Sequence, residues 1–558
     1  MKIRIGLVIC LSFANSVAAQ EAPADLLVTG ATIYTADVNN PVTTAFAVRQ
    51  DRIVRVGSEA EVLALEGPNT ERLDLSGLTV IPGMIDAHAH LALLAMFLRR
   101  VDLVGTTSFA DVIERVSEEA ATTQPGVWIR GYGWDQNDWE NKEFPTHEQL
   151  STVVPNNPVF LERIDGHAVL LNAVALDLVG ITAATSDPEG GRTLRDQQGN
   201  PTGVLIDNAA DSAEARLPAT SSQEIREAAR GAIAHLSAFG LTGIHDASVG
   251  QDTIDVFEEM AREGEFNLRS YIMVSNDDAN LEHYLRRGPQ FGLYDGRIWI
   301  RSIKIQVDGA LGSRGAALLE DYSDDPRNRG LITASYERVH EVAVRALRNG
   351  FQLNVHAIGD RGNRNVLDAY EAALDEVPVA DHRFRIEHAQ ILHPDDITRF
   401  AELGVIPSMQ GSHQTSDMYW ATDRVGPDRI RGAYAWRSLL DTGVIVPNGS
   451  DFPVESANPL ISFRAFFTRR DADGWPEGGW HPEQRTSREE ALLSMTLWPA
   501  QAAFMEDVVG SLSPGKYADF VVLDRDIMSV SEDQILDTKV LMTFLGGRLI
   551  YERSNVSN

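Results

Sequence analysis

The stretch from Val80 to Leu91 constrains the fold more than any other part of the chain. It is an apolar run that leads into the pair His88 and His90. Side chains two positions apart project to the same face only when the backbone is extended, so the pair predicts a strand with two converging imidazoles at its end. Neutral imidazoles are common ligands of transition metals. A lone His-x-His is often incidental, so further ligands must come from elsewhere in the chain.

Strand-like and helix-like patterns alternate through the middle of the chain. After the first strand, further strands are expected at residues 241–246, 267–274, 298–307, 351–355, 384–386, 405–408 and 444–447. Helical periodicity fills the intervals, at residues 225–239, 336–348, 363–374 and 394–402 among others. Eight strands with helices between them favour an α/β fold, a closed (β/α)8 barrel of the TIM type with its chemistry at the C-terminal strand ends. An open doubly wound sheet is the alternative.

Two further regions flank or interrupt this barrel, which is expected over residues 80–504. Short β-like runs punctuated by Gly, Asn and Asp predict one small β-sandwich domain built from both termini, residues 24–79 and 505–558. The interval between the first two barrel strands is too long for a crossover and has strand-like pieces of its own. It therefore predicts an inserted subdomain over about residues 100–220.

The first 19 residues are predicted to be a secretory signal peptide. Lys2 and Arg4 precede an apolar stretch, residues 5–13, and small residues at 17–19 form a cleavage site. The single cysteine, Cys10, lies in this segment, so a mature chain would have no disulfide and no thiolate ligand. No later stretch is apolar enough for a transmembrane helix. We therefore expect an exported protein, periplasmic or secreted, without stable membrane insertion.

Composition narrows the class of partner. Hydrophobic residues at 43% and charged residues at 23% are ordinary values for a globular protein with a large core. The formal net charge of −31 argues against nucleic acid or an anionic membrane surface, because both repel an acidic protein. The expected partner is a small-molecule substrate, and a homodimer is compatible with the sequence.

Metal-ligating side chains recur at the ends of later strands. His356, His388 and Asp451 each follow an extended apolar run, so they take the same topological position as the first histidine pair. Four histidines and one aspartate without a thiolate suit one or two borderline divalent ions, with zinc the expected metal.

These motifs resemble those of the amidohydrolase superfamily. The shared features are PGMIDAHAH on the first strand, single histidines on the fifth and sixth strands, an aspartate on the eighth, and the C-terminal segment VGSLSPGKYADF. The segments GYGWD at 131–135, DGH at 165–167, DGALGSR at 308–314 and TSDMYW at 415–420 resemble the amidohydrolase-3 branch, which includes YtcJ-like proteins and N-substituted formamide deformylases. The resemblance implies a metal-dependent hydrolase of C–N bonds outside ordinary peptides.

The resemblance also implies a bridging ligand on the fourth strand. In relatives with two metals, a lysine carrying a CO2 adduct joins the ions, and Lys304 is the candidate here. Carboxylation needs a neutral amine, and burial favours it by lowering the pKa of a lysine. The alternative is a lysine paired with a nearby acid such as Asp308.

The ligand set predicts a mechanism in which Asp451 is both a metal ligand and the catalytic proton acceptor. It would take a proton from a metal-activated water and pass it to the leaving nitrogen. A second metal or a polarising side chain would stabilise the oxyanion. The candidate substrate-binding residues are His167, Asp308 and Arg314 as polar groups and Trp134 and Trp420 as apolar walls.

Two other functions stay open. The same site could hydrolyse an ester, lactone or phosphoester. A catalytically silent protein that binds a metal or small molecule in a regulatory role is a different class, and the complete ligand set argues against it. Several polar residues are expected not to touch metal or substrate: His245 and Asp246 either support the ligands from behind or are structural, and His413, Asp321, Asp324 and Asp325 are solvated loop residues.

Overall fold

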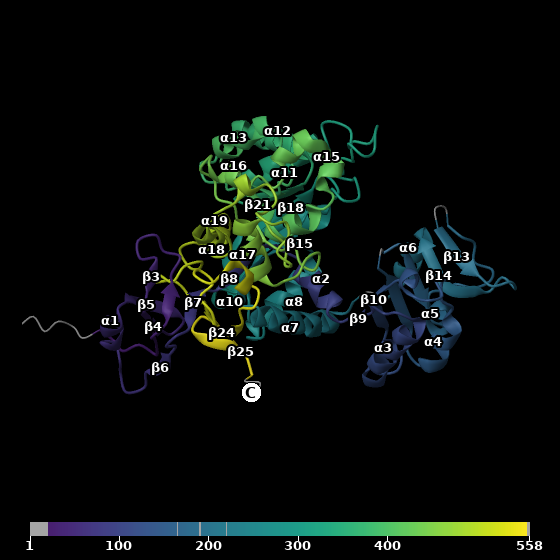
Figure 1. Cartoon of the computed structure of the whole chain (residues 1–558), viewed down its shortest axis with the longest axis horizontal. Coiled ribbons are helices and arrows are strands. Elements are labelled where there is room, and N and C mark those ends of the chain that lie inside the picture. Colours follow the sequence, from purple (N-terminus) through teal and green to yellow (C-terminus); the bar gives the residue numbers. More distant parts are fainter. Residues whose placement is uncertain (1–20, 165, 189–190, 219, 555–558) are drawn as a thin grey trace, which may run out of the picture.

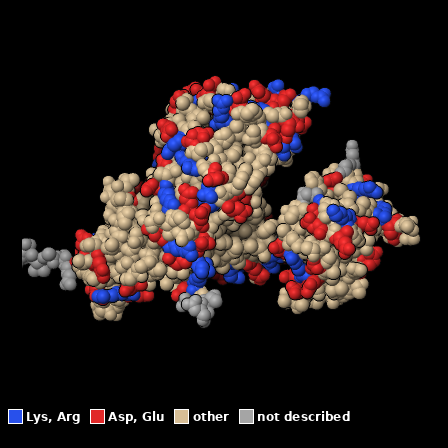
Figure 2. Space-filling model, in the orientation of Figure 1, with Lys and Arg blue, Asp and Glu red and all other residues tan. Residues whose placement is uncertain are grey.

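The computed structural model describes residues 21–164, 166–188, 191–218 and 220–554 (Figure 1). The predicted signal peptide, with Cys10, lies outside the described residues. Within the described part of the chain, no helix combines the length and apolar character that crossing a bilayer requires. Acidic and basic side chains are interspersed over the face seen in Figure 2.

Eight parallel strands form a nearly closed barrel, as predicted. In chain order they are β8 (Met84–Ala89), β15 (Leu241–Val249), β16 (Arg269–Ser275), β18 (Ile298–Gln306), β19 (Gln352–Ala357), β20 (Arg385–His388), β21 (Ile406–Gln410) and β22 (Asn448–Gly449). Each pairs with its chain neighbour in parallel. The eighth strand differs most from expectation: it was predicted at 444–447, but its pairing begins at Asn448. The open doubly wound alternative is therefore wrong.

The last strand returns beside the first. The backbone N–H of Asp451 donates to the carbonyl of His88 at 2.8 Å, which joins the two ends of the sheet. Gly449 permits this approach, because a Cβ at that position would lie 2.5 Å from the backbone nitrogen of His88. The buried Asp86 adds a second link, accepting from the backbone N–H of Ser450 at 3.1 Å and from its hydroxyl at 2.6 Å.

Helices surround the barrel and cover its apolar strands. They include α7 (Ser222–Ala238), α8 (Gln251–Arg262), α9 (Asp278–Arg287), α11 (Tyr336–Asn349), α12 (Asp360–Glu376), α13 (Pro394–Leu403) and α17 (Pro459–Thr468). Each presents apolar residues to one continuous core with the strands. Because both faces of a parallel sheet are covered, the strands are nearly continuous apolar runs, and the polar residues at their ends stand out.

Both ends of the chain contribute to a pair of small sheets. One sheet contains β1 (Leu26–Thr29), β4 (Ala45–Arg49), β5 (Arg52–Gly57) and β6 (Glu71–Asp74). The other contains β2 (Thr32–Tyr34), β3 (Val42–Thr43), β7 (Thr79–Pro82), β23 (Phe520–Leu523), β24 (Val540–Leu545) and β25 (Arg548–Glu552). β7 pairs with β23 antiparallel, so an N-terminal and a C-terminal strand lie side by side. Their facing side chains share one apolar cluster that includes Phe46 and Phe520.

A separate unit follows the first barrel strand. Helix α2 (Leu91–Phe97) leads into a six-stranded sheet made of β9 (Val101–Asp102), β10 (Ile129–Trp134), β11 (Val159–Arg163), β12 (Ala168–Leu171), β13 (Gly191–Arg195) and β14 (Pro201–Asp207). Helices α3 (Phe109–Thr122), α4 (His147–Val153), α5 (Ala173–Leu178) and α6 (Asn208–Glu214) pack on it. We call this unit the inserted domain. It has apolar clusters of its own, and Figures 1 and 2 show it standing apart from the barrel on the right.

Candidate metal centre

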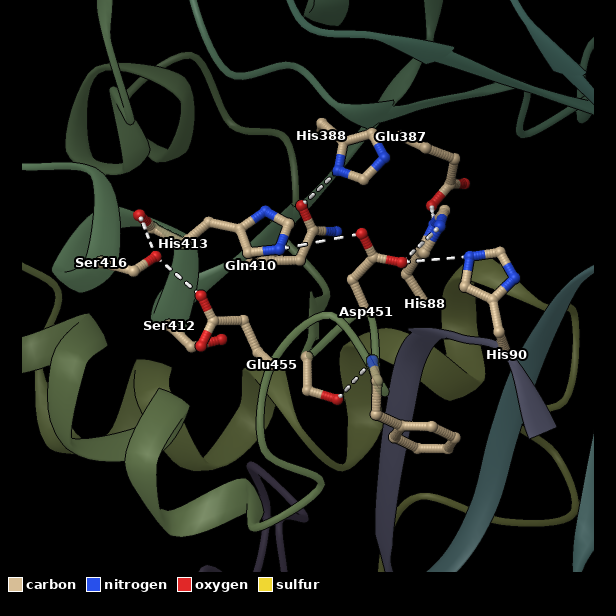
Figure 3. A network of polar contacts seen from close by, with 12 residues as sticks. His88, His90, Glu387, His388, Gln410, Ser412, His413, Ser416, Asp451 and Glu455 are labelled. Atoms are coloured by element: carbon tan, nitrogen blue, oxygen red, sulfur yellow. Dashed lines mark hydrogen bonds and ion pairs between the residues drawn. The ribbon is translucent and has the colours of Figure 1, made fainter. Parts of the chain in front are cut away.

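Three buried side chains converge at the C-terminal ends of the barrel strands (Figure 3). One ligand atom from each of His88, His388 and Asp451 lies within 4.8 Å of the others. His90 joins them, because its Nε2 lies 3.1 Å from Asp451 Oδ1. The ring of His356 lies 4.4 Å from that of His388, centroid to centroid. The structure therefore brings together all four histidines and the aspartate.

The backbone is unusual at two of these positions. His388 has φ 73° and Asp451 has φ 61°, in the left-handed region that residues with a side chain rarely adopt. His388 is the last residue of β20, and Asp451 lies two residues after the end of β22, so both stand where the chain leaves the barrel. Such outliers cluster at functional sites because the surrounding structure must stabilise them.

The charge states suit a divalent cation. Burial lowers the pKa of His88, His356 and His388, so these imidazoles are neutral and their lone pairs are available. Burial alone would raise the pKa of Asp451, but its contact with His90 and the neighbouring histidines hold that pKa well below its usual range. Neutral imidazoles around an ionised carboxylate are the donor set that zinc binds.

Several buried polar atoms at this site lack a protein partner. Among the described residues, His356 Nε2, Asp451 Oδ1 and His413 Nε2 are buried without a hydrogen bond. Buried polar groups are nearly always satisfied, so a cluster of such atoms is an environment that a bound ion or water would satisfy. The residues present therefore fit a bound divalent metal.

Lys304 lies on β18, and its charge interacts with His88 and His356. Its side chain is buried, and burial lowers the pKa of its ammonium group, while the charges of Glu387 and Asp451 oppose that shift. Asp308, the acid considered as its partner, is already engaged: it accepts from the backbone N–H groups of Ala317, Ile358 and Gly359. Burial thus shifts the pKa of Lys304 in the direction of the neutral amine that carboxylation requires.

Two predicted substrate residues have structural positions instead. Trp134 is only 1% exposed and lies in the core of the inserted domain, where its Nε1 donates to the carbonyl of Leu161 at 2.9 Å. It cannot form a pocket wall from there. Asp308 is fully buried with its carboxylate occupied by backbone N–H groups, and its Oδ1 lies 3.5 Å from His356 Nε2. It supports the fifth strand end and does not face open space.

The other candidates are accessible. His167 is exposed on the inserted domain, with Nδ1 2.9 Å from Asp207 Oδ1. Arg314 forms a two-pronged ion pair with Asp324, at 3.1 and 2.9 Å. The ring of Trp420 packs against Gly312, so the loop after β18 contacts the segment after β21.

The loop after β18 carries three acidic residues that were expected to be solvated, and this expectation was wrong because all three have protein partners. Asp324 pairs with Arg314 and Arg424, Asp321 accepts from Arg329, and Asp325 accepts from Asn328. Their carboxylates therefore fix the loop that covers the fourth strand end.

His413 was wrongly expected to be a solvated loop residue. It lies on α14 (Gly411–Asp417), immediately after the seventh strand, and its side chain is 13% exposed. Its Nε2 lies 3.7 Å from Asp451 Oδ2, and its ring stacks on that of His388 at 5.8 Å (Figure 3). The available signal was its place just beyond a strand end, the criterion that selected the other histidines.

The residues next to the second strand end have structural contacts. His245 Nδ1 lies 2.7 Å from Arg385 Nη1, and Asp246 Oδ1 accepts from the backbone N–H of Leu91 at 2.9 Å. Glu387, which sequence reasoning gave no role, contacts His88 Nδ1 through its Oε2 at 2.5 Å. The opposite charge two positions earlier, at Arg385, was the signal that could have identified it.

The sequence and the fold of this chain are similar to those of known proteins. The family described as "Amidohydrolase family" matches residues 71–551. The chain is 34% identical to the protein LONG AFTER FAR-RED 3 of Arabidopsis thaliana, covering 95% of this chain and 92% of that one. It is 32% identical to an N-substituted formamide deformylase of Arthrobacter pascens, covering 95% and 99%. An uncharacterised metal-dependent hydrolase of Pyrococcus furiosus superposes with a TM-score of 0.77 at 30% identity, covering 90% and 100%.

Proposed function

The chain belongs to the amidohydrolase family, and from this premise we propose that it hydrolyses a non-peptide C–N bond in a small amide, an N-substituted formamide or a cyclic amide. The observation that carries the proposal is the convergence of His88, His388 and Asp451 within 4.8 Å, with neutral imidazoles around an ionised carboxylate. The similarity to a formamide deformylase supports the choice of bond.

The metal would be held by His88, His90, His356, His388 and Asp451, with carboxylated Lys304 as a further ligand in a two-ion site. When bound, a divalent ion such as zinc supplies Lewis-acid chemistry that lowers the pKa of water towards about 7. The aspartate can also act on protons, because its carboxylate is ionised and lies beside the histidines that would hold the metal. It accepts the proton of the attacking water and passes it to the leaving nitrogen.

His413 supplies the polarising side chain that the reaction needs. Its Nε2 is buried, has no hydrogen-bond partner among the described residues, and is directed towards Asp451 from the side opposite His90 (Figure 3). A donor at that place can bind the substrate carbonyl oxygen and stabilise the negative charge that develops on it. His413 is therefore proposed to touch substrate, in place of the buried Trp134 and Asp308.

The test is a paired activity panel on the purified full chain with its metal content measured by elemental analysis. N-substituted formamides and small amides are compared with esters of matched shape. We expect bound metal and a higher kcat/KM for the C–N substrates. A preference for the esters would favour the ester or lactone hydrolase, and bound metal without turnover on a broad panel would favour the silent binding protein.

A further inference from the structure

We propose that Glu387, supported by Arg385, is a positioning residue that holds His88 ready to bind the metal. This inference rests on the proposed metal site but concerns two residues outside its ligand set. Both lie on β20, two positions apart, so they share the face that points into the barrel. His88 lies across the barrel on β8.

The contact between His88 and Glu387 determines which ring nitrogen is free. Oε2 of the glutamate lies 2.5 Å from His88 Nδ1, and the two side chains are 0% and 1% exposed. A carboxylate can only accept, so Nδ1 must donate its hydrogen. The lone pair of the neutral ring is then on Nε2, the nitrogen that lies 3.5 Å from Asp451 Oδ1.

Arg385 keeps the buried glutamate charged and in place. Its Nε lies 2.7 Å from Oε1, and its Nη2 donates to Oε2 at 3.0 Å. An isolated carboxylate would be costly at this depth, and a close guanidinium offsets that cost. The same guanidinium donates to the carbonyl of Ala87 at 2.7 Å and to Ser408 Oγ at 2.9 Å. It therefore ties β20 to β8 and β21 directly beneath the ligands.

Other histidines of the site are oriented in the same way, but by weaker acceptors. His90 Nδ1 lies 3.1 Å from the carbonyl oxygen of Ala247, and His388 Nδ1 lies 2.8 Å from Gln410 Oε1. Both acceptors are neutral, whereas Glu387 is a carboxylate. A charged acceptor on the distal nitrogen makes the ligating nitrogen a stronger donor and restricts ring rotation. His88 should therefore contribute disproportionately to metal affinity.

The experiment measures Zn²⁺ affinity rather than activity. The full chain is stripped of metal, and its Zn²⁺ dissociation constant is obtained by competition with a chromogenic chelator. For Glu387→Gln, which keeps the shape and removes the charge, we expect the dissociation constant to rise about 10- to 100-fold, the effect typical of losing such a partner.

The matched control is Asp519→Asn. Asp519, just before β23, forms a pair with Arg269 at 2.5 and 2.8 Å that is almost as deeply buried. The Asp519→Asn variant also loses a buried charge, but Asp519 does not contact a residue of the metal site. We expect its Zn²⁺ dissociation constant to stay within about twofold of the parent, since distant sites act independently, while the thermal midpoints of both metal-free variants fall.

The outcomes separate this inference from the metal site itself. If the parent chain binds no Zn²⁺, the proposed function fails first. If the parent binds and Glu387→Gln binds equally well, or no worse than Asp519→Asn, the positioning role is wrong. Should Glu387→Gln not fold, Glu387→Asp decides: it keeps the charge beside Arg385 but withdraws the oxygen from His88. Weaker Zn²⁺ binding by that variant supports the role, and parental affinity overturns it.

Discussion

The barrel mouth and the inserted domain both carry polar and aromatic residues of the family motifs, yet they use them differently. In the inserted domain, Trp134 donates to a backbone carbonyl and Arg163 binds Asp135 and Gln136. At the barrel mouth, buried nitrogen and oxygen atoms of His356, His413 and Asp451 have no hydrogen-bond partner among the described residues. These two side chains of the inserted domain are satisfied within it, whereas the three atoms at the barrel mouth are available to a ligand. A buried motif residue with an unsatisfied polar atom is therefore a stronger candidate for ligand binding than one whose polar atoms are all bonded within its own domain.

The largest effect is expected at Asp451. Asp451→Asn keeps the side-chain shape and removes the proton acceptor and a charged ligand, so kcat should fall by about 10²- to 10⁴-fold or more while the fold persists. Steady-state kinetics and the circular dichroism spectrum check this. Parental kcat would mean that the unsatisfied oxygen at the barrel mouth has no catalytic role.

A somewhat smaller loss is expected at His413. His413→Phe keeps a ring against His388 but removes the nitrogen proposed to bind the substrate oxygen, so kcat should fall by about 10²-fold, the usual cost of losing one such donor. Elemental analysis should find the metal content unchanged. Loss of metal together with activity would instead identify His413 as a ligand.

A variant of Trp134 tests the inserted domain, where the polar atoms of this residue are satisfied internally. Trp134→Phe removes the hydrogen bond to Leu161 and leaves a buried carbonyl unsatisfied, which should lower the free energy of unfolding of the inserted domain by about 1–3 kcal/mol. kcat at saturating substrate should not change. Denaturant unfolding and steady-state kinetics measure the two effects. A large fall in kcat at unchanged stability would mean that Trp134 contacts substrate after all.

Arg314 is expected to give the smallest effect. Its pair with Asp324 is partly exposed, and such pairs contribute between 0 and about 1 kcal/mol. Arg314→Ala should therefore leave the thermal midpoint almost unchanged. A rise in KM without a change in kcat would show that the loop after β18 contacts substrate. An unchanged KM would mean that Arg314 does not contact substrate and that this loop has only a structural role.

The barrel and the family were predictable from sequence because their signals are local and repeated. Apolar runs recur with histidine or aspartate at their ends, and the match to the amidohydrolase family confirms that interpretation. The eighth strand was misplaced because its ladder lies at the end of the apolar run: Pro447 has no N–H and contributes only its carbonyl, which accepts from Met409 at 2.9 Å, and the paired residues are Asn448 and Gly449.

The errors concern side-chain direction and partners, which a single sequence does not encode locally. Trp134 and Asp308 sit in motifs, but only the folded chain reveals that one faces a core and the other binds backbone N–H groups. His413 follows its strand on the first turn of a helix, so strand alternation could not orient it. Glu387 depends on a contact with a residue 299 positions away.

Closure of the barrel has a consequence for how the protein is made. Asp86 and Ser450 are linked across 364 residues, and that link joins the strand end that carries His88 and His90 to the one that carries Asp451. A nascent chain emerging from the ribosome therefore has no complete binding site until almost the whole barrel has been synthesised. The proposed metal site would thus form late in biogenesis, and a product truncated before Asp451 would lack both the ring closure and the proposed proton acceptor.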